Sequence, residues 1–234
     1  MPGYLTRQQA VAVAGAADLV MRSLLDREQF SDPLGAAARQ GISSAAWPMF
    51  GLLWPSGAQL AARIASRPMQ AGERLLEVGC GLALASLVGH RRGSDVTASD
   101  CHPLTGAFLA VNLRLNDLAP MKYRHGHWAG RLPDGLPADD PSIVQGRFDL
   151  IFGSDLLYDR DAGIALAGFI ERHASARAEV WIVDPDRGNR SVFNRLMSAQ
   201  GFELVEERLD TRADSLGATL SPAYRGRLLS YRRA

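Results

Sequence analysis

The chain has 234 residues, and its 26 lysine and arginine residues nearly balance 25 aspartate and glutamate residues, for a net charge of +1. This balance argues against a dedicated nucleic-acid-binding protein, which usually carries a strong basic excess. Apolar residues make up 47% of the chain and charged residues 22%, as in soluble globular domains and unlike disordered chains. No apolar run reaches the roughly 18 residues that a membrane-spanning helix needs, and the N-terminal residues do not resemble a signal peptide. We therefore expect a cytoplasmic protein without a membrane partner, built around one large domain.

The first 73 residues are expected to form an N-terminal helical extension. Thr6–Arg27 shows helical periodicity, and Ser56–Ser66 follows a Trp-Pro break as a second helix. Between them lies an aromatic stretch that also contains Pro and Gly, Ala46–Pro55. We interpret residues 1–73 as a lid that packs on the following domain and covers its ligand-binding edge, although Trp47 and Phe50 fit equally well as core residues.

From residue 74 to residue 234 the chain alternates short apolar runs with helical segments. The expected strands are Arg74–Gly79, Asp95–Asp100, Met121–Trp128, Phe148–Ser154, Glu179–Asp184, Glu203–Asp210 and Arg227–Arg232. The expected helices are Leu82–His90, Pro103–Asn116, Asp161–Ala174 and Arg190–Gln200, and Pro133–Gly146 is expected to be a surface loop. This order predicts an α/β, doubly wound and mostly parallel seven-stranded sheet, with the last two strands as an antiparallel hairpin.

Ligands of such sheets bind beyond the carboxyl ends of the strands, so the residues that follow each strand are informative. The first strand leads into Gly79-Cys80-Gly81, where two glycines allow a tight turn and close approach of a ligand to the backbone. A dinucleotide-binding fingerprint would need a third glycine at position 84, but this position holds a leucine. The sequence therefore argues against a nicotinamide-dependent dehydrogenase. Asp100 ends the second strand and suits a ribose diol, although it is also placed to cap the helix that starts near Pro103.

The fourth strand is followed by a carboxylate and then an aromatic residue. Asp155 is flanked by the apolar residues Phe152 and Leu156, and burying it without a partner would be costly. It is too far from Asp161 to cap the next helix directly. We therefore expect Asp155 to have a functional rather than a structural role, with Tyr158 beside the same pocket.

Other reactive side chains give weaker signals. Cys80 and Cys101 lie in different segments without a paired spacing, so neither a disulfide framework nor a zinc cluster is expected, and Cys80 is expected to be a small packing residue. His125 and His127 alternate along a predicted strand, but no third ligand stands at an identifiable spacing. No metal site is expected.

Taken together, these motifs resemble the class I (seven-β-strand) S-adenosylmethionine-dependent methyltransferases. More narrowly, they resemble the protein-lysine methyltransferase-like group that includes the electron-transfer-flavoprotein β-subunit lysine methyltransferase. The resemblance covers roughly positions 45 to 200, and the matching segments are Leu53–Gly57, Leu76–Gly81, Ala98–Asp100, Asn112, Trp128, Phe148–Tyr158 with its D-x-x-Y, and the Asp184–Gly188 turn. One departure is Ala83, where many members carry a third glycine.

The resemblance implies S-adenosylmethionine as the cofactor and assigns roles to individual residues. Asp100 would hold the ribose hydroxyls, the backbone of the glycine loop would pass the methionine moiety, and Asp155 and Tyr158 would face the acceptor amine. The full set of implied cofactor-binding residues is Trp54, Glu77, Gly79, Cys80, Gly81, Asp100, Cys101, His102, Trp128, Ser154 and Asp155.

The implied reaction is N-methylation of a lysine side chain in a protein, without a metal. Two alternatives stay open at this point. One is a methyltransferase of the same fold that acts on a small molecule. The other is a catalytically inactive cofactor-binding module, for which Ala83 is the best support because its methyl group could crowd the cofactor.

Overall fold

The computed structural model describes residues 3–126, 128, 136–137, 139–211 and 223–233. His127 and part of the predicted loop 133–146 lie outside the described residues. Among the described residues, no helix is both long and apolar enough to cross a membrane.

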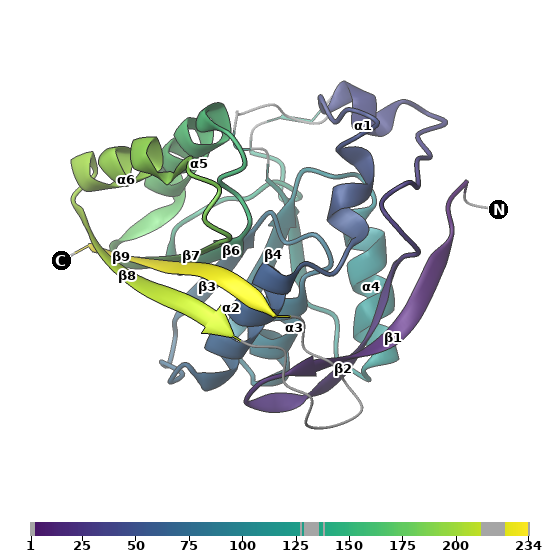
Figure 1. Ribbon diagram of the computed structural model, residues 1–234, viewed down its shortest axis with the longest axis horizontal. Helices are drawn as coiled ribbons and strands as arrows, with labels where there is room; N and C mark the ends of the chain where they lie inside the picture. Colours follow the sequence, from purple (N-terminus) through teal and green to yellow (C-terminus); the bar gives the residue numbers. More distant parts are fainter. Residues whose placement is uncertain (1–2, 127, 129–135, 138, 212–222, 234) are drawn as a thin grey trace.

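A seven-stranded sheet forms the centre of the molecule (Figure 1). Its strands are β3 (Arg74–Val78), β4 (Asp95–Asp100), β5 (Lys122–His125), β6 (Phe148–Ser154), β7 (Ala174–Asp184), β8 (Phe202–Thr211) and β9 (Tyr224–Arg233). The spatial order is β5-β4-β3-β6-β7-β9-β8, with the first five strands parallel and β9 antiparallel to both of its neighbours. The predicted fold class is therefore confirmed. After β3 the chain moves outward to β4 and β5 and then returns to the other side of β3, so strand order reverses between β3 and β6.

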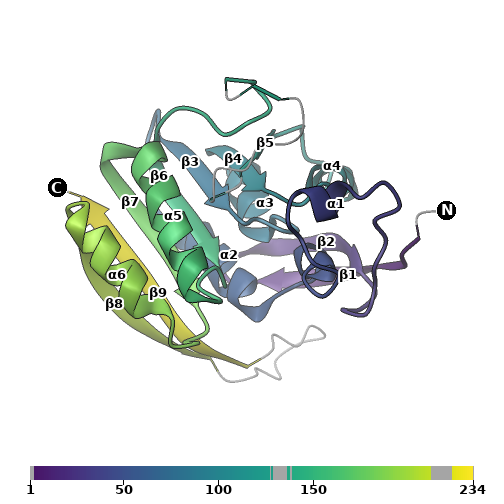
Figure 2. The same ribbon diagram turned by 90° about the horizontal axis from the view of Figure 1, so that it is seen from above.

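Helices cover both faces of this sheet, as Figure 2 shows from above. One face carries α2 (Pro55–Ser66), α3 (Leu84–Arg91) and α4 (Thr105–Leu115), and the other carries α5 (Arg160–His173) and α6 (Arg190–Ala199). Each of these helices falls within two residues of its predicted bounds. The short helix α1 (Ala36–Arg39) and the 3-10 helix η1 (Trp47–Gly51) were not predicted. Among the predicted strands, β5 is shorter than expected and β7 is longer.

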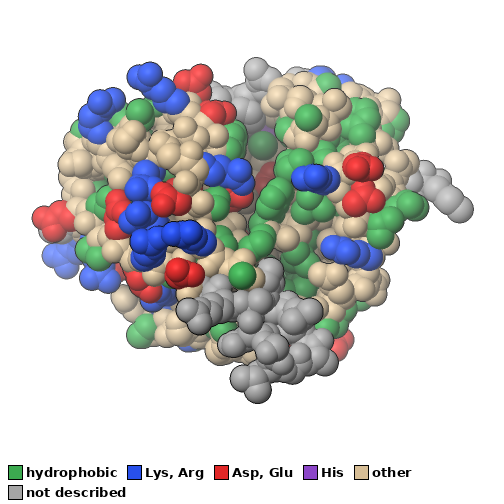
Figure 3. Space-filling view, in the orientation of Figure 1, with side chains coloured by type: hydrophobic (Ala, Val, Ile, Leu, Met, Phe, Trp, Pro, Cys, Tyr) green, Lys and Arg blue, Asp and Glu red, His purple; other side chains and the backbone are tan. Residues whose placement is uncertain are grey.

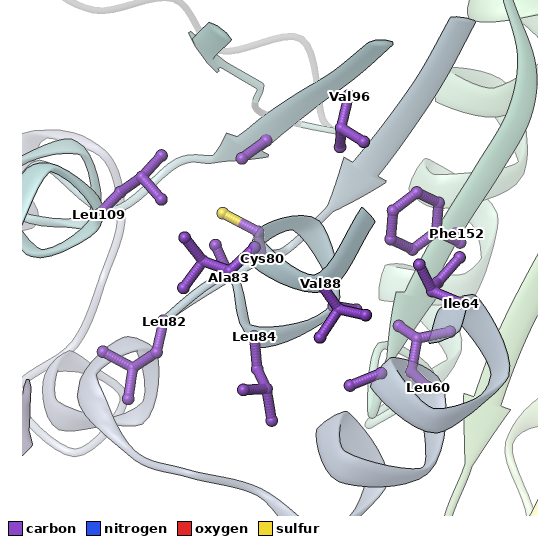
Figure 4. Packing of buried hydrophobic residues seen from close by; sticks show 14 of the residues in the cluster. Leu60, Ile64, Cys80, Leu82, Ala83, Leu84, Val88, Val96, Leu109 and Phe152 are labelled. Atoms are coloured by element: carbon purple, nitrogen blue, oxygen red, sulfur yellow. The ribbon is translucent and has the colours of Figure 1, made fainter. Parts of the chain in front are cut away.

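The core explains why the central strands are continuously apolar. Successive residues of β6 point into different hydrophobic clusters: Leu150 and Phe152 join the cluster under α2 and α3, whereas Ile151 joins the one under α5 and α6. Figure 4 shows Leu60 and Ile64 of α2 close to Phe152. A strand buried on both faces needs apolar side chains at every position, which is the pattern of Phe148–Ser154.

The helix predicted over Thr6–Arg27 is wrong, because this segment is an antiparallel hairpin of β1 (Thr6–Val13) and β2 (Ala16–Leu24). Burial along β2 follows a period of two, with Leu19 and Met21 fully buried and Val20 exposed between them. Gly15 supplies the turn at φ +80°. The alanines of the segment are compatible with a helix as well as with a strand. The alternation of buried and exposed side chains and the turn at Gly15 therefore determine that the segment forms a hairpin.

Two asparagines of α4 hold the hairpin against that helix. The Asn112 side chain is fully buried, accepts a hydrogen bond from Arg22 N at 2.8 Å, and donates one to Arg22 O at 3.4 Å. Asn116 makes the same pair of bonds with Val20, two residues earlier on β2, each at 2.8 Å. The side chains of α4 thus satisfy the backbone of the outer edge of β2.

The β5 edge of the seven-stranded sheet carries an exposed ion pair. Lys122, the first residue of β5, donates to both carboxylate oxygens of Asp95, the first residue of β4, at 2.6 and 2.9 Å. Both residues lie at the amino ends of parallel strands.

Candidate active site

The site residues meet where β3, β4 and β6 end. The three strands are parallel and adjacent, so the glycine loop after Val78, the end of β4 at Asp100 and the turn after Ser154 lie along one edge of the sheet, at its point of reversal. Figure 3 shows a hollow on the face of Figure 1, lined by acidic and hydrophobic side chains, between the side of α5 and α6 and the side of α1.

The glycine loop has the conformation that its sequence requires. Gly79 and Gly81 have φ values of +59° and +50°, in the left-handed region. A Cβ at Gly79 would lie 2.7 Å from Leu156 Cδ2 and 3.2 Å from Trp128 Cζ2, and a Cβ at Gly81 would lie 2.8 Å from the Phe50 carbonyl oxygen. Any side chain at either position would therefore collide with its neighbours. These contacts also place Trp128 beside the loop.

Asp100 links the glycine loop to the loop after β4. Its Oδ2 accepts a hydrogen bond from Gly81 N at 2.9 Å, and its Oδ1 accepts one from His102 N at 2.8 Å. Burial raises the pKa of Asp100, and the backbone N–H groups of these loops partly offset that rise. The capping alternative is wrong, because α4 begins only at Thr105 and receives no side-chain cap. Lone pairs remain on both oxygens of Asp100 for two further donors.

Glu77, near the end of β3, is hydrogen-bonded to the helix that follows the glycine loop. Its Oε2 accepts a hydrogen bond from Ser86 N, in the first turn of α3, at 2.8 Å. Burial raises the pKa of Glu77 to about 7. Ala83 precedes α3 with φ +59° and is fully buried, and its methyl group belongs to the hydrophobic core cluster.

His102 lies in an aromatic pocket formed by η1. Its ring stacks on Phe50 with centroids 3.7 Å apart and an interplanar angle of 11°, and meets Trp47 edge-on at 5.6 Å. Its Nδ1 accepts a hydrogen bond from Leu104 N at 3.2 Å, and burial lowers its pKa to about 4. The neutral ring therefore carries its proton on Nε2, which is buried without a hydrogen-bond partner in the described part of the chain.

The other residues of the N-terminal side and the two cysteines have mainly packing roles. Trp47 and Phe50 are buried in the core, whereas Trp54 is 37% exposed and donates through Nε1 to Met49 O at 2.9 Å. Burial raises the pKa of Cys80 well above its ordinary value and that of Cys101 to about 12. Cys80 is buried in the hydrophobic core cluster, in agreement with the expected packing role.

Beyond the end of β6, Asp155 is held from two directions. It has φ +56°, and its N–H donates to Val183 O of β7 at 2.9 Å. Its carboxylate receives both Nε and Nη2 of Arg187, at 2.9 and 2.8 Å. Tyr158 is 57% exposed, and Ser154 lies near Gly57 at the start of α2, with Oγ 3.7 Å from the position of a Cβ there.

The role of Arg187 in this site was not predicted from the sequence, and neither was that of Asp184. Asp184 ends β7 beside Asp155, is 1% exposed, and has no hydrogen-bond partner for either carboxylate oxygen among the described residues. The sequence did contain a signal for Asp184, which begins the Asp-Pro-x-Arg turn. Asp184 ends a buried strand, and a carboxylate at the end of a buried strand is also the pattern by which Asp155 was selected. No group of three or more His, Cys, Asp or Glu side chains in the described ranges could hold a metal ion.

Comparison with solved structures supports the fold. The chain superimposes on a magnesium protoporphyrin IX methyltransferase from Synechocystis, crystallised with bound S-adenosylmethionine, with a TM-score of 0.55 and 15% identity over 76% of this chain and 78% of the other. A methyltransferase from Pyrococcus furiosus gives a TM-score of 0.53 and 17% identity over 77% of this chain and 83% of the other. The fold is that of the class I methyltransferases.

Sequence comparison points to a narrower set of relatives. The electron transfer flavoprotein beta subunit lysine methyltransferases of Danio rerio and Mus musculus are 25% and 26% identical over 184 and 182 residues, 76% of this chain. The match spans 66% of the length of each of these relatives. Protein N-lysine methyltransferase METTL21A of Danio rerio is 28% identical over 143 residues, which is 61% of this chain and 63% of the relative. No family model matches the chain. The resemblance inferred from the motifs is therefore confirmed by sequence similarity to the same group.

Proposed function

We propose that this protein is an S-adenosylmethionine-dependent N-methyltransferase that methylates a lysine side chain of a protein. The observation that carries the proposal is the position of Asp100, which ties the glycine loop to the end of β4 at the reversal point of the sheet. Sequence similarity to curated lysine methyltransferases supports the type of acceptor.

The residues present fit the cofactor. Asp100 retains lone pairs for the two ribose hydroxyls, and the unpartnered Nε2–H of His102 offers a donor to an adenine nitrogen. Because the glycine loop has no room for side chains at Gly79 and Gly81, its backbone would face the methionine moiety. Trp128 lies against the same loop. When bound, the cofactor supplies a methyl group that is activated by the positive charge on sulfur.

The contribution of the chain is to align and deprotonate the acceptor. Holding two reactants in line is worth up to about 7–11 kcal/mol in favourable cases. A lysine amine has a reference pKa near 10.4 and must lose its proton before it can attack, so the site needs a group that accepts this proton. Asp155 would orient the amine and accept its proton through water, and Tyr158 would flank it.

Calorimetric titration with S-adenosylmethionine and S-adenosylhomocysteine tests the cofactor, with NADH as the control ligand. We expect both sulfur compounds to bind and NADH not to bind. Asp100→Asn should weaken their affinity by about tenfold or more, because charge-assisted hydrogen bonds to the ribose are lost. Asp95→Asn is the matched control at the other end of β4 and should bind normally. Absence of binding to the unmodified protein would refute the proposal.

The acceptor is tested by incubating a cell lysate with the protein and tritium-methyl S-adenosylmethionine. Labelled methyl-lysine in hydrolysed protein is the expected result, and Asp155→Asn should reduce the label by more than it weakens cofactor binding. Label confined to small molecules would establish the metabolite alternative. Cofactor binding without transfer to any acceptor would favour the inactive module.

Location in the cytoplasm is also part of the proposal. Cys80 and Cys101 are both free thiols, as is usual in reducing compartments. Fluorescence imaging of the tagged protein in its native cell would test the location. We propose a protein acceptor rather than a nucleic acid or a membrane lipid, and the labelled fraction of the lysate distinguishes these.

A further inference from the structure

The carboxylate of Asp155 is already occupied by a cation. Arg187 binds it through two parallel hydrogen bonds of 2.9 and 2.8 Å, and the Asp155 side chain is only 15% exposed. A bidentate guanidinium neutralises the carboxylate and occupies one acceptor position on each of its oxygens. An acceptor ammonium group would therefore compete with Arg187 for this carboxylate. Since the Arg187 side chain is 47% exposed, the surrounding protein does not enclose it.

A second carboxylate leaves the sheet beside Asp155. Ser154 pairs with Val183 across β6 and β7, so Asp155 and Asp184 leave the sheet next to each other. Asp184 is 1% exposed, and neither of its oxygens has a hydrogen-bond partner among the residues that the structure describes. Burial raises the pKa of Asp184, and the positive charges of Arg190, Arg187 and Arg227 oppose that rise. Leaving a buried carboxylate without a donor is costly, so Asp184 is a ready position for a cation.

The other two guanidinium groups that act on Asp184 are engaged elsewhere. Arg190 forms an ion pair with Asp186 and lies 3.9 Å from Glu206. Arg227 contacts the same two carboxylates, at 3.4 and 3.1 Å. Arg187 differs from both because its described partner is Asp155, the residue that the acceptor would need.

We propose that Arg187 is a displaceable counter-ion of the acceptor site: it pairs with Asp155 when no acceptor is present, and it moves to Asp184 when a cationic side chain takes its place. The inference rests on the proposed function, because it assumes that Asp155 faces the acceptor. Arg187 and Asp184 are then positioning residues. The move exchanges one carboxylate–guanidinium pair for another, which keeps its free-energy cost low.

The charge balance at this site gives the proposal a consequence for specificity. Two carboxylates and one guanidinium leave one negative charge, which a single ammonium group neutralises. A neutral acceptor of the same shape would leave Asp155 without a cation after Arg187 has moved. The site therefore selects a primary ammonium group, such as that of lysine, over an uncharged group.

The probe for this exchange is n-butylammonium, which has the charge and length of a lysine side chain, with n-butanol as its neutral control. We would titrate each into the S-adenosylhomocysteine complex and follow the arginine Nε–H signals by NMR, with Arg187→Gln identifying the signal of Arg187. The Arg187 signal should shift with n-butylammonium and not with n-butanol. This measurement uses the unmodified residues, so it stands even if a variant fails to fold.

A double-mutant cycle distinguishes positioning from a direct or structural role. Asp184→Asn should weaken n-butylammonium binding by about tenfold, because Arg187 then has no second carboxylate to receive it. Combining it with Arg187→Gln should restore binding to the level of Arg187→Gln alone. Asp186→Asn is the matched control, since it makes the same chemical change two residues away, at a carboxylate paired with Arg190 and Arg227.

Two results would overturn the proposal. One is an Arg187 signal that n-butylammonium leaves unmoved. The other is a loss from Asp184→Asn that is equally large with and without Arg187. Calorimetric titration with S-adenosylhomocysteine should give the same affinity for all of these proteins. Failure of that titration in the unmodified protein would count against the proposed function, whereas normal cofactor binding without the exchange would count against this inference alone.

Discussion

Asn116 of α4 and Val20 of β2 exchange two hydrogen bonds, each 2.8 Å long, in which the side-chain amide takes the place of a neighbouring strand. Asn112 repeats the arrangement one helical turn earlier, against Arg22. The hairpin is therefore anchored to the helix that follows the loop of Asp100 and His102 in the chain.

Replacement of Asn112 should loosen the hairpin. Asn112→Leu keeps the size of the buried side chain but leaves Arg22 N and O without their partners, so we expect the free energy of unfolding to fall by about 1–3 kcal/mol. Urea unfolding measures the change. Arg114→Ala, at an exposed position of the same helix, is the control and should have little effect. Equal stability of the Asn112 variant and the unmodified protein would contradict this account of the anchor.

The buried carboxyl group of Glu77 should make stability depend on pH. Its pKa rises from 4.5 in the unfolded chain to about 7 in the folded one, so the folded state binds the proton more tightly. The stability that Glu77 contributes is complete below pH 4.5 and is lost as the pH rises through 7. Glu77→Gln removes this loss, so at pH 8 the variant should be more stable than the unmodified protein by up to about 3 kcal/mol, with little difference at pH 5.

Urea unfolding of both proteins at several pH values between 5 and 8 tests the Glu77 prediction. Other titrating groups affect both proteins alike, so the difference between the two curves isolates Glu77. Parallel curves across this range would show that Glu77 does not change its protonation there.

Ala83 should impair neither folding nor cofactor binding. The left-handed conformation costs a residue with a Cβ about 1–2 kcal/mol, but a glycine at this position would lose about 0.5–1 kcal/mol of chain entropy and about 0.8 kcal/mol of methyl burial. Ala83→Gly should therefore change the free energy of unfolding by less than about 1 kcal/mol. Since the methyl group packs in the core, affinity for S-adenosylmethionine should stay within about twofold. A large gain in affinity would instead show that the methyl group crowds the cofactor.

Both cysteines should be unreactive in the folded protein. With a pKa of about 12, Cys101 is thiolate at about one part in ten thousand at pH 8, and the pKa of Cys80 is also raised well above its ordinary value. We expect no reaction with Ellman's reagent at pH 8 until guanidinium chloride unfolds the chain, after which two thiols should react. Rapid reaction of either thiol in the folded protein would contradict the assigned burial.

The sequence was most informative where burial leaves little choice. Phe148–Ser154 was predicted residue for residue as β6, because a strand covered on both faces must be apolar throughout. The hairpin was missed for the opposite reason: it is rich in alanine, and β2 is buried on one face only. The two asparagines that hold it lie about 90 residues away in sequence, beyond the reach of any local pattern.

The same contrast holds within the candidate site. Asp100 and the glycine loop follow strands that had been identified, so their meeting at one edge could be predicted from strand order. The pairing of Arg187 with Asp155 could not, because it depends on the turn after β7 folding back over the end of β6. Strand order places backbones, whereas such a pair depends on the path of a single loop.

The ion pair of Lys122 and Asp95 has a practical consequence. Lys122 is the only lysine in the chain, and it lies at the amino edge of the sheet, whereas Asp155 lies beyond the carboxyl edge. The six residues of β4 put about 17 Å of strand between these edges. One molecule therefore cannot bring its lysine to its own proposed acceptor site. Methyl-lysine formed by the purified protein would come from added acceptors or from the exposed Lys122 of a second molecule, and Lys122→Arg would provide a lysine-free protein in which every labelled lysine belongs to the acceptor.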